Sequence, residues 1–226
     1  MNVRRLLLSI ASVVLFVTAI PAQDLSSYRK FAFGADLAVI AKQTGLRPAE
    51  AQTICQRPQL IQSLDWQPRS TSNPSPAELK SVKGVLFRFY NGALSSVAIT
   101  YDRDSTAGMT VGDMIDAISV NYGTPTKPAE EVFFPSIYAE TLKVLARWED
   151  SEYSFRLVQS SYPAVFGLLG TSKSLDALAS AALTQAKAID AKEAPQKEID
   201  RRQREEEASR LELEKLRQVN KIGFRP

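Results

Sequence analysis

The sequence predicts an α+β protein: a two-layer sandwich of an antiparallel sheet with helices on one face, followed by a long, charged C-terminal helix. Each of the two apolar segments, 84–101 and 142–161, has the pattern of an antiparallel hairpin. A segment whose apolar residues recur at helical spacing lies between them. Helices between antiparallel hairpins are typical of α+β sandwiches. From residue 174 the composition changes sharply, first to alanine and then to charged residues, which predicts a helix without its own core.

The clearest local signal is Asn91-Gly92, which lies between apolar and aromatic runs at 84–90 and 93–101. Asn and Gly tolerate the positive φ angles of a type I′ turn, whose twist matches that of the flanking strands. In the first run Val85, Phe87 and Phe89 alternate with a mixed set of side chains. We therefore expect one face of the sheet to be buried and the other to be more exposed to solvent.

Two helices are expected beside the sheet. In the first, apolar residues from Leu37 onward lead up to Thr44-Gly45, where the glycine acts as a C-cap. In the second, apolar residues recur at helical spacing after Thr110, which forms a capping box with Asp113, and Gly123 ends the helix.

The remaining body segments are less regular in sequence. Residues 60–68 are predicted to form a strand that reaches Trp66, and residues 164–170 a short apolar strand. The proline-containing segment 124–135 is interpreted as an irregular crossing. The globular α+β domain is therefore expected to cover residues 23–170.

Residues 171–226 are predicted to form a helical arm that is broken near Pro195, with a short irregular tail. Proline is tolerated in the first turn of a helix, so a second helix is expected to begin there. Residues 196–217 contain 14 charged residues among 22, with opposite charges four residues apart, as in Glu198 and Arg202. The apolar stripe expected before the break consists of Leu175, Leu178, Ala182, Ile189 and further alanines.

A helix this polar cannot pack as an independent unit, so we expect the arm to bind an unidentified protein partner or a second copy of the chain. The apolar side chains expected to contribute most to that binding are Leu211, Leu213, Leu216, Val219 and Phe224. A heptad repeat sustained over three or more repeats is absent, so a self-contained coiled coil is not required.

The N-terminus predicts export. Arg4 and Arg5 precede fifteen mostly apolar residues, and Ala22 offers a small residue for cleavage, so residues 1–22 are interpreted as a signal peptide. An uncleaved anchor is the alternative; after cleavage no stable membrane span is expected, and the chain would be periplasmic or secreted. Removing residues 1–22 leaves 26 basic and 25 acidic residues, so nothing in the charge favours nucleic acid as a partner.

The chain contains no histidine, which excludes histidine-based catalytic triads and most zinc sites, and no cofactor is expected. Cys55 is the only cysteine, so an intramolecular disulfide cannot form. A hydrolase that uses carboxylates alone stays open as a third hypothesis. The carboxylates that could supply such a pair are Asp102, Asp104, Asp113, Glu149 and Asp150.

Trp66 and Trp148 could line a ligand cleft if they converged, although core positions also explain them. The runs FRFYNGAL, NYGTP and RWED, with NKIGFRP at the end, resemble small α+β modules of exported bacterial proteins of unknown function. The resemblance covers about residues 28–226 and implies no active-site residues. We therefore expect a non-catalytic bacterial envelope protein that interacts through its arm; a small-ligand-binding module is the alternative.

Overall fold

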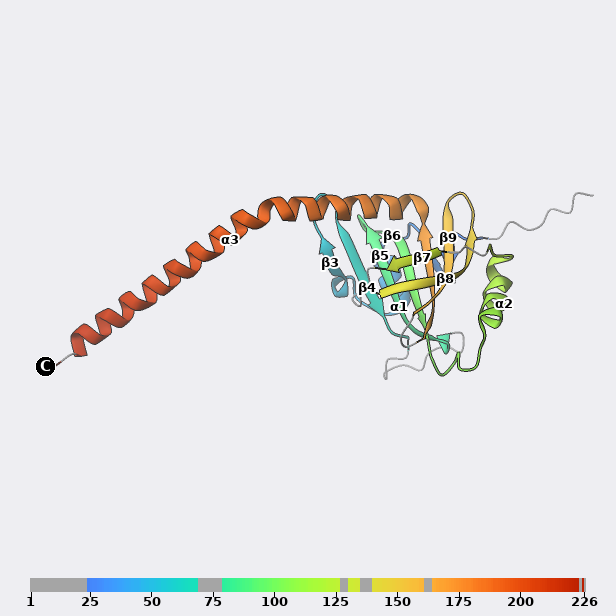
Figure 1. Ribbon diagram of the computed structural model, residues 1–226, viewed down its shortest axis with the longest axis horizontal. Helices are drawn as coiled ribbons and strands as arrows, with labels where there is room; N and C mark the ends of the chain where they lie inside the picture. The colour runs from blue at the N-terminus through green and yellow to red at the C-terminus, as the bar shows by residue number, and fades with distance from the viewer. Residues whose placement is uncertain are drawn as a thin grey trace, which may run out of the picture.

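The computed structural model describes residues 24–68, 79–126, 130–134, 140–160, 164–223 and Arg225 (Figure 1). It confirms the predicted α+β class, the antiparallel sheet and the long C-terminal helix. The predicted signal peptide lies outside the described residues. The elements are β1 (Ser27–Tyr28), β2 (Phe31–Ala32), α1 (Leu37–Thr44), the 3₁₀ turn η1 (Pro48–Glu50), β3 (Gln52–Cys55), β4 (Ile61–Trp66), β5 (Val82–Tyr90), β6 (Ala93–Tyr101), α2 (Val111–Tyr122), β7 (Glu130–Phe134), β8 (Glu140–Glu149), β9 (Tyr153–Gln159), β10 (Phe166–Ser172) and α3 (Lys173–Gly223).

Among the described residues, the main sheet has eight antiparallel strands in the order β3-β4-β5-β6-β10-β9-β8-β7, and β1 and β2 form a small separate ladder. Both predicted hairpins are present: β5–β6 and β8–β9. The β5–β6 turn uses Asn91 and Gly92, whose φ angles are 48° and 84°, as the sequence predicts. Strand β10 pairs with both β6 and β9 and thereby joins the two hairpins into one sheet.

The expectation of an irregular crossing at 124–135 is wrong for Glu130–Phe134, which form β7 and pair with β8. The three prolines of the segment, Pro125, Pro128 and Pro135, all fall outside the strand. Because β7 is at the edge of the sheet, it needs hydrogen bonds on one side only, and five residues containing Val and two Phe suffice for it.

The main core lies between one face of the sheet and the two short helices. The predicted buried face is confirmed, since Val85, Phe87 and Phe89 are each at most 1% exposed. Aromatic rings fill much of this layer: Phe31 meets Phe87 edge-on with ring centroids 4.8 Å apart.

Both predicted helices form for the reasons visible in the sequence. The Asp36 carboxylate accepts a hydrogen bond of 2.7 Å from the backbone N–H of Ala38 at the start of α1, and Gly45 ends the helix with φ 78°. The Thr110–Asp113 capping box begins α2. The buried side chains of the two helices belong to the same core: Ile40, Ala41, Met114, Ile118 and Tyr122.

The opposite face of the sheet is mixed, as predicted from β5. Arg88 of β5 and Arg156 of β9 lie on it, and the first turn of α3 places Asp176 near both. Burial raises the pKa of Asp176, while the two arginines oppose that shift. Asp176 and the two arginines therefore interact with one another between α3 and the sheet.

Helix α3 begins on this mixed face and crosses the sheet (Figure 1). Ala179 and Ala182 pack with Ile61 of β4, and Ala186 is also buried. Leu178, expected on the buried stripe, is instead 50% exposed. The side of α3 that faces the sheet carries alanines instead. Their small side chains let the helix backbone approach the strands more closely than leucine would.

The predicted break near Pro195 is not present: α3 runs for 51 residues with Pro195 inside it, about 75 Å at 1.5 Å per residue. A proline removes one backbone N–H and crowds the carbonyl four residues earlier, which bends a helix without necessarily ending it. Figure 1 shows α3 changing direction where it leaves the sheet, and Pro195 is the only proline in the helix.

Candidate functional site

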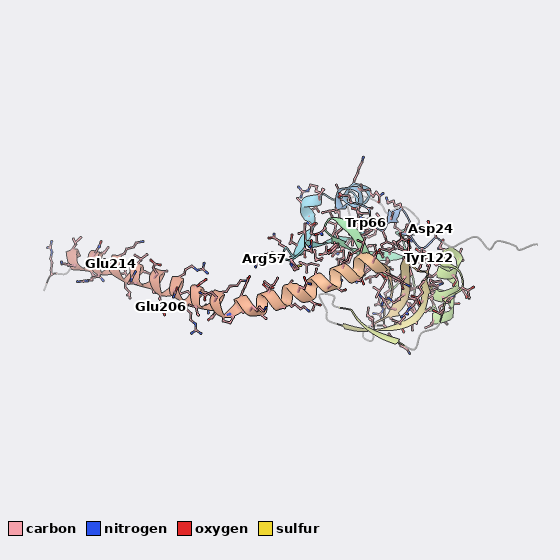
Figure 2. All side chains as sticks on the ribbon, turned by 90° about the horizontal axis from the view of Figure 1, so that it is seen from above. Asp24, Arg57, Trp66, Tyr122, Glu206 and Glu214 are labelled. Carbon is pink, nitrogen blue, oxygen red and sulfur yellow. The ribbon has the colours of Figure 1, made fainter. Side chains whose placement is uncertain are left out.

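The last ion pair between α3 and the body, among the described residues, joins Glu193 to Arg57 in the β3–β4 loop. Two hydrogen bonds of 2.9 and 3.1 Å connect the guanidinium and the carboxylate, and Lys197 approaches the same carboxylate at 2.9 Å. The hydrogen bonds from Arg57, followed by that from Lys197, contribute most to lowering the pKa of Glu193 to about 2. Arg57 therefore holds α3 at the point where the helix leaves the body (Figure 2).

Beyond Glu198 the side chains of α3 are exposed, as judged from the described part of the chain. Only part of the helical arm predicted at 171–226 projects from the body. From here on we use the name arm for residues 199–223, all of whose side chains are exposed. At 1.5 Å per residue the arm projects about 38 Å, and Glu206 and Glu214 mark it in Figure 2. Most helices in proteins are stabilised mainly by tertiary packing, which the exposed side chains of the arm do not supply, so ion pairs or a partner can add to its stability.

Ion pairs are present at the base of the arm. The predicted pair Glu198–Arg202 is confirmed at 2.9 Å, and Arg201 adds pairs with Glu198 at 2.8 Å and with Glu205 at 2.6 Å. Each exposed pair of this kind stabilises a helix by only about 0.2–0.5 kcal/mol. The pairs therefore favour helix formation but give the arm no tertiary contact.

An apolar stripe runs along the outer half of the arm. Leu211, Val219 and Ile222 are 49%, 67% and 87% exposed. With Ala208 and Lys215 they follow each other at intervals of three, four, four and three residues, which keeps them on one side of the helix. We name Ala208, Leu211, Lys215, Val219 and Ile222 the arm stripe.

The other apolar residues predicted to bind a partner lie differently. Leu216, 51% exposed, flanks the arm stripe, whereas Leu213, 67% exposed, lies on roughly the opposite side of the helix from it. Phe224 lies outside the described residues. The helix geometry therefore joins only part of the predicted set into one surface.

A second feature is a pocket of about 630 Å³ between α2 and the segment around β1. Figure 2 labels two of its residues, Asp24 and Tyr122, on the part of the body remote from the arm. The described residues that line it are Asp24, Ser27, Tyr28, Arg29, Ser81, Tyr101, Ser105, Thr106, Met109, Met114, Ala117, Ile118, Asn121, Tyr122 and Leu168.

Three tyrosines dominate the polar side of this pocket. Burial raises the pKa of Tyr28, Tyr101 and Tyr122, and for Tyr101 the two other phenols add to the effect. The Tyr122 hydroxyl makes a long hydrogen bond of 3.4 Å to the Ser27 carbonyl oxygen. All three phenols therefore stay protonated at physiological pH and can donate a hydrogen bond.

The two tryptophans considered as cleft residues are core residues that do not line this pocket. Trp66 is 8% exposed and lies 5.5 Å from the Phe31 ring, centroid to centroid. Trp148 is 2% exposed and its indole N–H donates to the Gly123 carbonyl at 2.8 Å. They belong to β4 and β8, between which β5, β6, β10 and β9 are placed in the sheet.

Four of the five carboxylates considered for a catalytic pair have local partners. Asp102 accepts hydrogen bonds from Ser105, and Asp113 caps α2. Glu149 is 3.0 Å from the Lys173 amino group, and Asp150 accepts backbone hydrogen bonds in the β8–β9 turn. These contacts account for the four side chains as turn, cap and ion-pair residues.

Within the described part of the chain, no group of three or more Cys, Asp or Glu side chains is placed to hold a metal ion. No helix among the described residues combines the length and the apolar character that crossing a membrane requires.

The fold and these two features define an α+β protein with a projecting helix and a separate tyrosine-lined pocket. Comparison with known proteins gives no match to a family, to a curated protein or to a solved structure.

Proposed function

We propose that this protein is an exported, non-catalytic interaction module whose arm pairs in antiparallel orientation with the arm of a second copy. The observation that carries the proposal is the arm itself: an entirely exposed helical segment with apolar side chains along one side on both sides of Lys215. A helix that adds nothing to its own core and ends in exposed leucine, valine and isoleucine is best explained by a surface that covers it.

The spacing of the arm stripe favours a second copy as that surface. The intervals of three, four, four and three residues read the same in both directions from Lys215. In an antiparallel pair with its two-fold axis at Lys215, Leu211 of one arm therefore faces Val219 of the other. Ala208 faces Ile222 in the same way, and such self-complementarity is what a two-fold interface requires.

The charge of the arm permits this pairing. Residues 207–223, which overlap in a pair with its axis at Lys215, carry four basic and three acidic side chains, so the net repulsion between two arms is small. The two Lys215 side chains at the axis can extend their amino groups to water along the sides of the pair. Burying a leucine or valine side chain stabilises by about 1.5–3 kcal/mol, against about 0–1 kcal/mol for an exposed ion pair. The stripe should therefore drive the association.

The export part of the proposal is supported by the N-terminal sequence alone. N-terminal sequencing of the protein recovered from the cell envelope or the medium should begin at Gln23. Recovery only from the cytoplasm with residues 1–22 intact would contradict export.

Val219→Lys should convert the dimer into monomers, because it places a charge opposite Leu211 of the second arm. Leu213→Lys is the matched control, since both residues are 67% exposed and only Val219 belongs to the stripe. Light scattering across a concentration series measures the molar mass. A wild-type mass of one chain at every concentration, or the same loss with both substitutions, would contradict the proposal.

A further inference from the structure

A smaller pocket lies on the mixed face of the sheet, where two arginines face each other. Arg147 of β8 and Arg156 of β9 are directly opposite each other in the pairing of the two strands. Both line a pocket of about 260 Å³ beside the first turn of α3. Like charges at directly opposite positions destabilise a sheet, so strand pairing by itself does not favour this pair.

The acidic groups of the pocket do not serve both arginines equally. Glu149 lies 3.6 Å from Arg147 and 3.0 Å from Lys173, nitrogen to oxygen, so one carboxylate is shared by two basic groups. Asp176 is the other acidic residue among the described lining residues. With three basic and two acidic side chains, the described lining carries a net charge of +1.

Arg156 is the basic group of the pocket that is left without a direct ion pair among the described residues. Its Nε is enclosed and has no hydrogen-bond partner there, whereas its two terminal nitrogens are not enclosed, and the side chain lines the pocket. Burial lowers the pKa of Arg156, and the charge of Arg147 adds to this effect, while the two carboxylates oppose it. An anion at the terminal nitrogens would offset the repulsion between the two arginines.

The size and the hydroxyl groups of the pocket favour a small oxyanion. Its volume of about 260 Å³ is below the about 300–1,000 Å³ of typical small-molecule sites. Ser154 and Thr171 add hydroxyl groups to the lining, and the Thr171 hydroxyl makes a long hydrogen bond of 3.5 Å to the Ser154 carbonyl oxygen. These donors come from three strands, which suits the tetrahedral oxygens of a phosphate group better than the two coplanar oxygens of a carboxylate.

We propose that this pocket binds a phosphate group, with Arg156 and Arg147 contacting its oxygens from β9 and β8 and the Thr171 hydroxyl from β10. The site lies at the end of α3 opposite the arm (Figure 1), so it goes beyond the pairing of two arms and does not depend on it. The phosphate group can belong to free phosphate or to a lipid headgroup, and two probes separate these sources.

The first probe is inorganic phosphate, titrated into the full chain in calorimetry with chloride keeping the ionic strength constant. Saturable binding is expected, and Arg156→Gln should weaken it about tenfold or more, the usual loss for a hydrogen bond to a charged group. Phosphate should also raise the melting temperature of the wild type and not that of Arg156→Gln, a difference that a purely structural arginine would not produce.

The second probe is a phosphatidylcholine vesicle that contains phosphatidate, compared in cosedimentation with a vesicle that lacks it. Binding to the phosphatidate vesicle that requires Arg156, without binding of inorganic phosphate, would assign the site to a lipid headgroup. Binding of inorganic phosphate without binding to the vesicle would assign it to a free phosphate.

Arg103→Gln is the matched control, because Arg103 is exposed, lies outside the pocket and loses the same charge. It should leave phosphate binding unchanged, whereas Asp176→Asn removes a competing negative charge from the pocket and should tighten binding. Equal weakening by Arg103→Gln and Arg156→Gln, or no binding to either probe that requires Arg156, would overturn the proposal. Val219→Lys should bind phosphate as the wild type does, which separates this test from that of the arm.

Discussion

Phe87→Ala should lower the free energy of unfolding by about 3–5 kcal/mol, the usual result for removing a buried phenylalanine. The Phe87 side chain is 0% exposed, and its ring lies 4.8 Å from that of Phe31 and 6.4 Å from that of Trp66, centroid to centroid. Such a loss is a large part of the about 5–15 kcal/mol by which domains are stable. Denaturant unfolding measures it, with Trp66 as a fluorescent reporter in the same cluster.

Lys83→Ala is the control for this prediction. Lys83 is exposed on the same strand, so its substitution should change the free energy of unfolding by no more than about 0.5 kcal/mol. A loss below about 1.5 kcal/mol for Phe87→Ala would mean that the site collapses around the smaller side chain and that the aromatic layer is not rigid.

Gly170→Ala should destabilise the protein by about 1–3 kcal/mol, although it adds only one methyl group. A Cβ at position 170 would lie 2.5 Å from the nearest carbon of the Phe155 ring and 3.0 Å from a Val97 methyl carbon. The Phe155 ring cannot move aside easily, because it is 0% exposed and stacked on Tyr122 with centroids 4.3 Å apart. Strand β10 must therefore shift, or Phe155 must leave its position.

Gly84→Ala is the matched control, because Gly84 also lies within a strand of the sheet but has room for a Cβ, with the nearest atom at 3.7 Å. It should be neutral or mildly stabilising. Phe155→Leu in the Gly170→Ala background should recover part of the loss, since a smaller side chain relieves the contact. Equal effects of the two glycine substitutions in denaturant unfolding would refute the steric explanation.

These two sites differ in what the sequence reveals about them. The alternation of Val85, Phe87 and Phe89 beside Asn91-Gly92 predicts the hairpin and its buried face, because the side-chain period and the turn chemistry are both local. The need for glycine at 170 depends on the ring of Phe155 on the neighbouring strand. That contact follows from the pairing of β9 with β10, which a local pattern does not specify.

The same distinction explains the differences along α3. The sequence predicts a charged helix correctly, because ion pairs four residues apart and the absence of apolar residues are local signals. It fails at Pro195, where the helix continues through the proline, and at Leu178, which is exposed while Ala179 and Ala182 face the sheet. Tyr28, Tyr101 and Tyr122 come from three distant parts of the chain, so no spacing could have grouped them into one pocket.

Disulfide formation at the proposed two-fold axis tests the central claim, the pairing of two arms, most directly. In a Cys55→Ser background, Lys215→Cys provides a single thiol that should face its own copy across the axis, within the short reach that a disulfide bridges. Leu213→Cys provides an equally simple control on the other side of the helix. Under mild oxidation the account predicts that a covalent dimer accumulates at position 215 well before it does at position 213. Equal rates at the two positions, or no covalent dimer at position 215, would contradict it.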